Sequence, residues 1–585
     1  MRYHVLADVY EQLEKTPAKL KKTGIIAGLL KGAEKGELYR IALLLQGRVF
    51  PSYDEREIGI ASQSMEKILA QASGFSVEDV GRMFRKIGDF GLVAEEMTEK
   101  KKQRTLMETP LTVKKVFENL QRLASVEGRG SQERKFSLVA ELVSSAKPKE
   151  AKYIVRTVIG DLRIGVAEGI LRDAIAGAFL KTETMEQKKE AASAVEWAWF
   201  LRPDYGEIAE IAKERGEAGL KKIGLEVGKP YHVQLAEKSP GLEEALESFE
   251  KPALEFKYDG ARIVIEKKGE KLWFYTRRLE NVTKQFPELQ GIVMSGVKAG
   301  ECIIEGEMLG FDRKTGKPMP FQFLSQRIKR KYDIEKMAKE IPIQVNLFDI
   351  VYLSGKELFD EPLSKRWELL KRIIKPIKGK FQLAEHIETK DFHEADKFYR
   401  KALAASQEGL IVKNLNAKYQ PGRRVAGGWL KVKPIMETLD LVIIGATWGT
   451  GKRAGWFGSF VLGCRDGDEF KNCGMIGTGI KEKKEAPGRR AGEGSAEAGG
   501  VTFEELTKLL KPKIVEEHGN EVRLKPDVVA EVAYEEIQKS PNYESGYALR
   551  FPRVVKIRPD KDISEADTKA RVERLYSMQK GEIRG

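Results

Sequence analysis

A lysine near the middle of the chain stands in a sequence that suits nucleophilic attack on phosphorus. Lys257 begins the stretch Lys-Tyr-Asp-Gly-Ala-Arg, residues 257–262, and follows the apolar approach Leu-Glu-Phe, which is typical of a buried strand. A lysine amine attacks only when it is deprotonated, and the reference pKa of lysine is about 10.4. Partial desolvation or neighbouring positive charge, including a metal ion, lowers that pKa. A pocket at the end of a strand supplies such surroundings.

The pattern Lys-x-Asp-Gly is weak evidence when it stands alone. By residue frequencies it arises by chance about once in several chains of this length. The simplest alternative is a surface turn, with Asp259 and Gly260 as turn residues and a solvated Lys257. The rest of the chain must therefore decide between a nucleophile and a turn.

Downstream residues supply the other groups that phosphoryl transfer needs, which are cations for phosphates and carboxylates for metal. Arg277 closes a predicted hairpin, and Glu-Gly-Glu at 305–307 follows a strand that we expect to be buried. Glu408 precedes another strand, and Lys431 and Lys433 alternate so that both point to one face. Each group alone is more readily explained as a solvated strand end than as a ligand. Their order from residue 255 to residue 433 is not accidental.

The size and composition of the chain limit the class of protein to which it can belong. A chain of 585 residues and 65.9 kDa is too long for one core and predicts three or four domains. No run of about 18 apolar residues occurs, and the first residues resemble no secretory signal, so we expect a cytoplasmic protein. Three cysteines cannot form a four-thiolate zinc site. Cys464 and Cys473 either pair or serve as small buried hydrophobic residues.

The net charge of +14 and the pI of about 9.2 favour a polyanionic partner. Nucleic acid ranks ahead of a membrane because no basic amphipathic helix stands out. Two alternatives remain, which are a charge that serves solubility and the Lys/Glu-rich surface of a thermophile.

Three patterns follow one another along the chain. Apolar spacing to about residue 220 predicts helices, joined by glycine-rich basic turns such as 128–131 and 160–165 that suit phosphate contacts. From about residue 223, strands and helices alternate, which predicts an α+β domain. Beyond residue 434, short strands separated by glycines predict a small β-barrel. The segment 481–500, rich in Lys, Glu, Gly and Ala, predicts a mobile loop.

With these features together, the chain resembles the ATP-dependent DNA ligases of the archaeal and eukaryotic type, in the covalent nucleotidyltransferase superfamily. The resemblance covers nearly the whole chain, and further motifs that carry it lie at 47–51, 160–165, 548–553 and 558–561. It implies a multidomain fold of three parts. These are an all-α DNA-binding domain over 1–222, an α+β adenylation (nucleotidyltransferase) domain over 223–434 and a C-terminal OB-fold β-barrel over 435–585.

The resemblance also implies an activity. The enzyme would seal nicks in double-stranded DNA during replication, repair and recombination, with ATP as co-substrate and Mg²⁺ (or Mn²⁺) as cofactor. A lysyl-AMP intermediate would pass AMP to the 5′-phosphate, and the 3′-hydroxyl would then displace it. Such a protein would be a cytoplasmic, nucleoid-associated monomer that binds no membrane.

The family pattern implies roles for the residues that bind the nucleotide. Lys257 would accept AMP, Glu255 would read the adenine amino group and Phe348 would stack on the adenine. Arg262 and Arg277 would hold ribose and phosphate.

The family pattern implies further roles in binding metal and phosphate. Glu307 would hold the ribose and metal, and Glu408 would also bind metal. Lys431 and Lys433 would stabilise the phosphates. Three cations of the last domain would orient pyrophosphate in the first step, namely Arg550, Arg558 and Lys561.

The sequence departs from the family pattern in places. The segment 421–429 is one residue longer than usual, so we assign the nucleotide-binding arginine there to Arg424 rather than Arg423. The loop at 481–500 is also longer. A sliding-clamp motif is often present in the helical domain, but residues 103–106 match it poorly. Residues 449–452 resemble a P-loop, yet Arg453 replaces the Ser/Thr that would bind Mg²⁺, so we reject that reading.

Four alternatives are weighed against this reading. An RNA-capping guanylyltransferase shares the lysine motif, but the long helical region and the arginines at 550–553 disfavour it. An RNA ligase lacks a comparable helical domain. An NAD-dependent ligase requires a four-cysteine zinc site. A non-enzymatic DNA-binding scaffold explains the charge and the helices but not the ordered motifs.

Overall fold

The structure is a computed structural model that divides into two compact units. It describes residues 1–34, 36–100, 110–319, 321–330, 332–425, 427–434, 436–449, 453, 455–482 and 501–579. The first unit comprises Met1–Glu237, Gly260–Glu385 and Lys413–Trp429, and the second comprises Lys238–Asp259, His386–Val412 and Leu430–Gly585. Three sequence features lie wholly or largely outside the described residues. They are the clamp-like motif at 103–106, the glycine-rich segment at 450–452 and positions 483–500 of the predicted loop.

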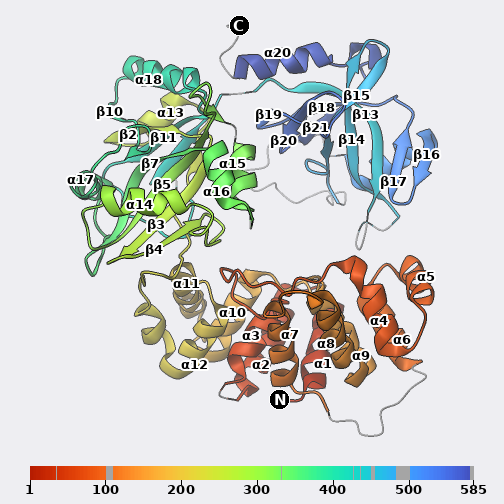
Figure 1. Ribbon diagram of the computed structural model, residues 1–585. Helices are drawn as coiled ribbons and strands as arrows, with labels where there is room; N and C mark the ends of the chain where they lie inside the picture. Colours follow the sequence, from red (N-terminus) through yellow and green to blue (C-terminus); the bar gives the residue numbers. More distant parts are fainter. Residues whose placement is uncertain are drawn as a thin grey trace. The chain divides into compact units, whose positions relative to one another are not determined.

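The described residues up to Lys221 fold mainly into helices, as predicted (Figure 1). The helices are α1 Tyr3–Lys15, α2 Lys19–Gly32, α3 Leu38–Leu44, the 3₁₀ turn η1 Ser62–Ser64, α4 Met65–Ser73, α5 Val77–Ile87, α6 Phe90–Glu99, α7 Val113–Ala124, α8 Ser131–Ser145, α9 Pro148–Val158, α10 Glu168–Phe179, α11 Met185–Leu201 and α12 Tyr205–Lys221.

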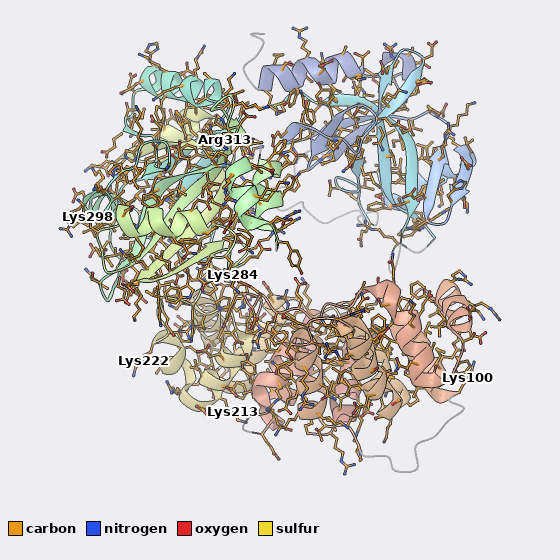
Figure 2. The ribbon with its side chains drawn as sticks, in the orientation of Figure 1. Lys100, Lys213, Lys222, Lys284, Lys298 and Arg313 are labelled. Carbon is orange, nitrogen blue, oxygen red and sulfur yellow. The ribbon has the colours of Figure 1, made fainter. Side chains whose placement is uncertain are left out.

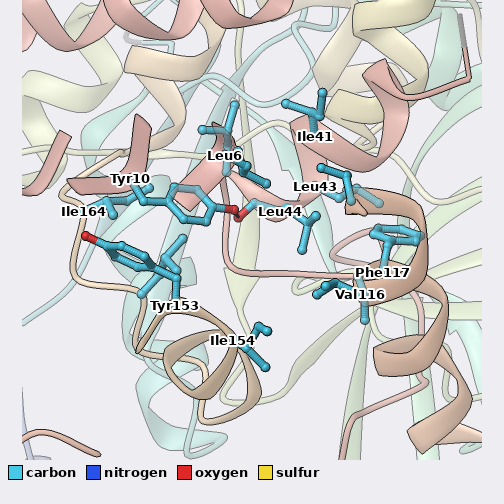
Figure 3. Packing of buried hydrophobic residues seen from close by; sticks show 14 of the residues in the cluster. Leu6, Tyr10, Ile41, Leu43, Leu44, Val116, Phe117, Tyr153, Ile154 and Ile164 are labelled. Carbon is cyan, nitrogen blue, oxygen red and sulfur yellow. Dashed lines mark hydrogen bonds between the residues drawn. The ribbon is translucent and has the colours of Figure 1, made fainter. Parts of the chain in front are cut away.

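The apolar faces of these helices meet in one continuous core. Within it the rings of Tyr10 and Tyr153 lie 5.1 Å apart, and the Tyr10 hydroxyl donates to the Leu44 carbonyl at 2.8 Å (Figure 3). Buried tyrosine hydroxyls need such partners, because an unpaired polar group is costly in an apolar core. The helical periodicity in the sequence therefore reflects burial against other helices.

A seven-stranded sheet forms the other part of the first unit. Its strands are β3 Ala261–Lys268, β4 Lys271–Thr276, β5 Glu301–Phe311, β6 Pro318–Met319, β7 Ile343–Leu353, β8 Lys356–Glu357 and β9 Phe381–Leu383. The main order is β4-β3-β5-β7-β8, with β6 on β5 and β9 on β7. Helices α14 Pro287–Gly296, α15 Phe321–Ile328, α16 Ile334–Glu340 and α17 Leu363–Ile373 accompany it.

The hairpin predicted after Lys257 is present as β3 and β4, paired from Ile263–Thr276 to Lys268–Lys271. One prediction about this sheet was wrong. Residues 305–307 do not follow a strand but lie inside β5, where Glu305 is fully buried. A buried acid interrupts the apolar pattern, so the sequence places the strand end too early.

The second unit begins with a small sheet of order β1-β12-β11-β2-β10. Its elements are β1 Glu237–Lys238, α13 Leu242–Glu247, β2 Pro252–Lys257, β10 His386–Glu388, α18 Phe392–Ala404, β11 Gly409–Asn414 and β12 Trp429–Val432. Helix α18 packs on β2, where the rings of Phe256 and Phe398 lie 4.9 Å apart. The buried residues of β2 thus hold its last residue, Lys257, at the edge of a packed layer.

The C-terminal part of the second unit is rich in strands, as predicted. Its elements are β13 Leu439–Trp448, β14 Phe457–Asp466, β15 Glu469–Ile476, α19 Phe503–Leu510, η3 Lys511–Lys513, β16 Ile514–His518, β17 Glu521–Leu524, β18 Val529–Ala533, β19 Glu536–Lys539, β20 Tyr547–Arg550, β21 Arg553–Ile557, η4 Ile563–Glu565 and α20 Lys569–Gln579. The main order is β15-β14-β13-β17-β16, and β18 joins β13 to β21. The ladders between these described strands do not close into a barrel.

Two further sequence predictions concern cysteines and surface charge. Cys464 and Cys473 are free thiols buried in the core of the C-terminal sheet, which agrees with their reading as small hydrophobic residues. Figure 2 shows basic side chains of the first unit that point outward, among them Lys213, Lys222 and Lys298.

In the described part of the chain, no helix has the length and apolar character needed to cross a membrane.

Candidate active site

Lys257 is the first side chain of β2 that leaves the buried layer. The residues before it in the strand are buried, and its own side chain is 21% exposed. The Lys257 carbonyl accepts a hydrogen bond from the Glu408 amide at 2.9 Å. The Lys257 ammonium nitrogen lies 2.6 Å from Glu408 Oε2. The surface-turn alternative is therefore wrong, because Lys257 is largely covered and paired.

Glu408 joins two of the predicted lysines. Its Oε2 lies 2.6 Å from Lys257 Nζ and 2.5 Å from Lys433 Nζ. Although burial acts to raise the pKa of Glu408, the charges and hydrogen bonds of the two lysines hold that pKa at about 2. The carboxylate is therefore ionised at neutral pH, and two cations converge on it.

The chain around this cluster is fixed by close backbone contacts. The Gln407 side-chain carbonyl accepts from the Asp259 amide at 3.1 Å, and the Gln407 amide group donates to Ala405 O at 2.9 Å. A Cβ at Gly409 would lie 2.2 Å from the Val432 carbonyl, so only glycine fits there. These contacts hold the segment from 405 to 409 against the end of β2.

The carboxylate of β2 lies two residues before Lys257. Glu255 is 3% exposed and pairs in register with His386 of β10. The Glu255 Oε1 and His386 Nδ1 atoms lie 3.2 Å apart. By strand alternation Glu255 and Lys257 share one face of the sheet.

Arg262 is the second residue of β3 in the first unit and is held by two acceptors. One of its terminal nitrogens donates to Glu305 Oε2 at 2.5 Å and the other to the Gln234 carbonyl at 2.7 Å. Its guanidinium carbon lies 5.2 Å from the ring centroids of both Phe348 and Trp429, within cation–π range. The predicted residues Arg262 and Phe348 are thus neighbours.

Gly260, the glycine of the lysine motif, is required for steric reasons. A Cβ at Gly260 would lie 2.5 Å from the Met308 carbonyl of β5. Glycine at this position therefore allows β3 and β5 to pair with Arg262 directly opposite Glu307. This register places Arg262, the cation of the lysine motif, across from the predicted carboxylate Glu307.

Three arginines share one region of the first unit. Burial lowers the pKa of Arg277, and the nearby charges of Arg262 and Arg424 lower it further, while Glu307 acts in the opposite direction. Arginines gather in this way where an anion can relieve their mutual repulsion. Arg423, in contrast, pairs with Glu196 of α11 at 2.7 Å. The two adjacent arginines therefore have different surroundings.

The remaining predicted lysine and the C-terminal cations lie in the second unit. Lys431 is half-buried in β12, and its carbonyl accepts from the Ser239 amide at 3.0 Å. Arg550 pairs with Glu536 at 3.3 Å. Arg558 and Lys561 both pair with Asp440, at 3.2 and 2.6 Å. These last three cations are thus held by acids of their own C-terminal region.

Several residues that shape the site stand in no motif of the sequence. Gln407 contacts Asp259, His386 contacts Glu255, and Tyr231 and Tyr419 both contact Glu305. Glu305 stands in the Glu-Gly-Glu motif, but its contact with Arg262 was not predicted. Strand alternation places Glu305 on the same face as Glu307, which is the signal that could have found it.

Three family models match successive parts of the chain. Residues 2–176 match the model described as DNA ligase N terminus, residues 233–433 match the ATP dependent DNA ligase domain, and residues 453–561 match the ATP dependent DNA ligase C terminal region.

Curated relatives cover the chain from end to end. A protein named DNA ligase from Nanoarchaeum equitans (strain Kin4-M) is 48% identical over 586 residues, with 100% of both chains covered. A DNA ligase from Thermococcus fumicolans is 42% identical over 582 residues, with 99% of both chains covered.

A solved structure, titled Pmar-Lig_Pre., agrees with the fold. It has a TM-score of 0.58 at 15% identity, and covers 94% of this chain and 99% of its own. The family models and the identities over the full length together show that the chain belongs to the ATP-dependent DNA ligases.

Proposed function

We propose that this chain seals nicks in duplex DNA through an AMP adduct on Lys257. The observation that carries the proposal is the position of Lys257 at the end of β2, with its amine against Glu408. In the first step Lys257 Nζ forms a bond to the α-phosphorus of ATP. The bond from that phosphorus to the bridging oxygen breaks, and pyrophosphate leaves. A proton must leave Nζ before its lone pair can attack.

The role proposed for Glu408 is to orient the Lys257 amine. A carboxylate with a pKa of about 2 is a poor proton acceptor, so Glu408 is not assigned as the general base. It holds Nζ at the strand end, while Lys433 supplies a second positive charge to the same oxygen. Lys431 and Lys433 are assigned to the phosphates, because cations there offset the charge that moves to the leaving group.

The proposed nucleotide site combines a carboxylate, an aromatic ring and three arginines. Glu255 is assigned to the adenine amino group, and Phe348 to stacking on the adenine. Arg262 and Arg277 are assigned to ribose and phosphate, with Arg424 beside them. The shared position of the three arginines supports an anionic ligand.

The residues present fit a divalent cation that is bound partly by substrate. No group of three or more His, Cys, Asp or Glu side chains in the described ranges is arranged to hold a metal by itself. Mg²⁺ usually binds through one or two carboxylates together with substrate phosphates. Glu307 and Glu408 are the proposed ligands, and Mn²⁺ is an alternative metal. When bound, the cation would neutralise charge on the phosphates.

AMP then passes from Lys257 to the 5′-phosphate of the nick, and the 3′-hydroxyl displaces AMP to close the strand. Duplex binding is assigned to residues 1–222, adenylation to 223–434 and an OB-fold to 435–585. The antiparallel ladders that β13 forms with β14 and β18 support the OB-fold assignment. Arg550, Arg558 and Lys561 are assigned to pyrophosphate orientation. The protein is proposed to act as a cytoplasmic, nucleoid-associated monomer, and its match to the sliding-clamp motif at residues 103–106 is weak.

Mass spectrometry of the intact protein after incubation with ATP and Mg²⁺ tests the central claim. We expect one added AMP on the wild type and none on Lys257→Ala or Lys257→Arg, since a guanidinium does not deprotonate to act as a nucleophile. Lys268→Arg is the matched control, because Lys268 is an exposed lysine that pairs with Glu301. Normal labelling of either Lys257 variant would refute the assignment. Labelling by GTP in place of ATP would favour a capping-type activity.

A further inference from the structure

The carboxylate of Glu305 is completely buried and receives three hydrogen bonds from side chains. Tyr231 and Tyr419 each donate their hydroxyl to Glu305 Oε1 at 2.5 Å. Arg262 donates to Glu305 Oε2 at 2.5 Å. Glu305 has no solvent exposure and lies within β5. A buried carboxylate is tolerated when charge and hydrogen bonds satisfy it in this way.

The three donors come from distant parts of the chain and are themselves linked. The Tyr419 hydroxyl also accepts from the Gln234 amide at 2.8 Å, and the Gln234 carbonyl accepts from Arg262 at 2.7 Å. Burial and the charge of Glu305 raise the pKa of Tyr231 and Tyr419 well above the usual range, so both hydroxyls stay protonated donors. The result is a closed ring of hydrogen bonds that holds two nitrogens of Arg262.

Two aromatic rings lie beside the Arg262 guanidinium. Phe348 and Trp429 stand edge to face, with centroids 5.9 Å apart, and each ring lies 5.2 Å from the guanidinium carbon. Lys413 Nζ lies 4.4 Å from the Phe348 centroid and 4.6 Å from that of Trp429. Arg262 therefore has one well-defined position.

We propose that Glu305 is a positioning residue for ATP binding, which fixes Arg262 and through it the face of Phe348. This inference rests on the proposed role of Arg262 and Phe348 at the nucleotide. A freely rotating arginine loses side-chain entropy when it binds phosphate or ribose, whereas an arginine that is already fixed does not. Glu305 removes that cost before ATP arrives. Tyr231 and Tyr419 hold Glu305 itself, because they occupy the oxygen that Arg262 does not use.

Glu266 provides a comparison within the same sheet. It is also completely buried, on β3, but within the described part of the chain its side chain accepts a hydrogen bond only from the Gly228 backbone amide. The sheet thus contains one buried acid joined to an arginine and one that is not. Substitution of Glu266 tests the cost of removing a buried acid without any change at Arg262.

The experiment is a double-mutant cycle on self-adenylylation of the full chain. The ATP concentration that gives the half-maximal labelling rate (KM) and the maximal single-turnover rate constant (kcat) are measured for the wild type, Glu305→Gln, Arg262→Ala and the double variant, with Glu266→Gln as control. We expect Glu305→Gln to raise KM roughly tenfold, because a hydrogen bond to a charged group is weakened, with little change in kcat. In the Arg262→Ala background the same substitution should leave KM unchanged. Glu266→Gln should leave KM unchanged in both backgrounds.

Each other outcome has a definite meaning. A normal KM in Glu305→Gln, with a raised KM in Arg262→Ala, overturns the positioning role alone. A rise in KM that persists without Arg262 shows a general structural role for Glu305 and also overturns it. A normal KM in Arg262→Ala overturns the proposed nucleotide contact and the positioning role with it. If Glu305→Gln does not fold, Tyr231→Phe takes its place in the same cycle. It removes one donor to Glu305 and should raise KM only while Arg262 is present.

Discussion

Lys257 and Glu408 meet twice, through a hydrogen bond from the Glu408 amide to the Lys257 carbonyl and through an ion pair of 2.6 Å between their side chains. The backbone contact fixes where β2 ends, and the ion pair fixes where the amine lies. Glu408 therefore fixes the position of the proposed nucleophile and is also its charge partner. The ion pair also occupies the amine, so attack on phosphorus requires that Lys257 leave Glu408.

Replacement of Glu408 should impair the first step more than it impairs the fold. In Glu408→Gln we expect self-adenylylation to fall at least about tenfold, because both the orientation of Lys257 and the proposed metal ligand are lost. An AMP-labelling assay with a Mg²⁺ series measures this. Glu535→Gln is the control, since Glu535 lies 3.9 Å from Lys433 and is more exposed. Equal labelling by the two variants would contradict the role of Glu408.

Glu266 should make stability depend on pH in the neutral range. Burial raises the pKa of Glu266 to about 8, against 4.5 for the free side chain. Between these values the unfolded chain has lost the proton and the folded chain keeps it. The free energy of unfolding therefore decreases as pH rises from about 4.5 to 8.

Glu266→Gln stays neutral and should lack this decrease. Its stability relative to the wild type should therefore grow by a few kcal/mol from pH 5 to pH 8. Urea unfolding of both proteins at several pH values measures the difference. A difference that stays constant over this range would show that Glu266 is ionised in the folded protein.

Local patterns were sufficient for most of the secondary structure. The hairpin after Lys257 could be predicted because alternation and a Lys-Gly turn both lie within a few residues. Strand ends were harder to predict, since they depend on which polar residues the fold can satisfy. Glu305 was placed after a strand because a buried acid is rare in a sheet.

The partners of the site residues could not be predicted in the same way. Tyr231 and Tyr419 reach Glu305 from 74 and 114 residues away, and neither stands in a recognisable motif. Such contacts depend on how sheets and loops pack, which one sequence does not encode as a local pattern. The predicted residues Arg262 and Phe348 were found together, whereas the network that holds them was not foreseen.

The helical region contains a buried acid whose loss should be costly. Asp89 is 5% exposed, accepts from the first amides of α6 and pairs with Arg156 at 2.7 Å and Arg163 at 3.0 Å. Asp89→Ala would leave the buried Arg156 without its closest carboxylate. We expect a loss of stability of about 3–5 kcal/mol, as for other broken buried ion pairs.

Arg163 lies in the turn at 160–165, in a left-handed backbone conformation with φ of 57°. Release of this residue in Asp89→Ala should also weaken nicked-duplex binding, while self-adenylylation at permissive temperature stays normal. The control is Asp8→Ala, which breaks an exposed pair with Lys149 of 2.7 Å and should cost less than about 1 kcal/mol. Thermal unfolding and a gel-shift assay separate the two effects. Equal losses in both variants would show that the buried position of Asp89 is unimportant.

Nick binding and self-adenylylation should respond differently to salt concentration. Binding of a nicked duplex releases counterions from DNA wherever lysine or arginine contacts phosphate, so the logarithm of affinity should fall linearly with the logarithm of salt concentration. A protein that makes about six such contacts loses roughly a thousandfold in affinity between about 50 and about 200 mM salt. Self-adenylylation uses only ATP, and its rate should change far less. The measurement is nick binding and AMP labelling of the full chain over one salt series. The net charge of +14 gives the reason to expect a steep slope, but charge alone does not locate the contacts. A flat binding curve would show that the excess charge serves solubility and that base or sugar contacts dominate recognition of the nick.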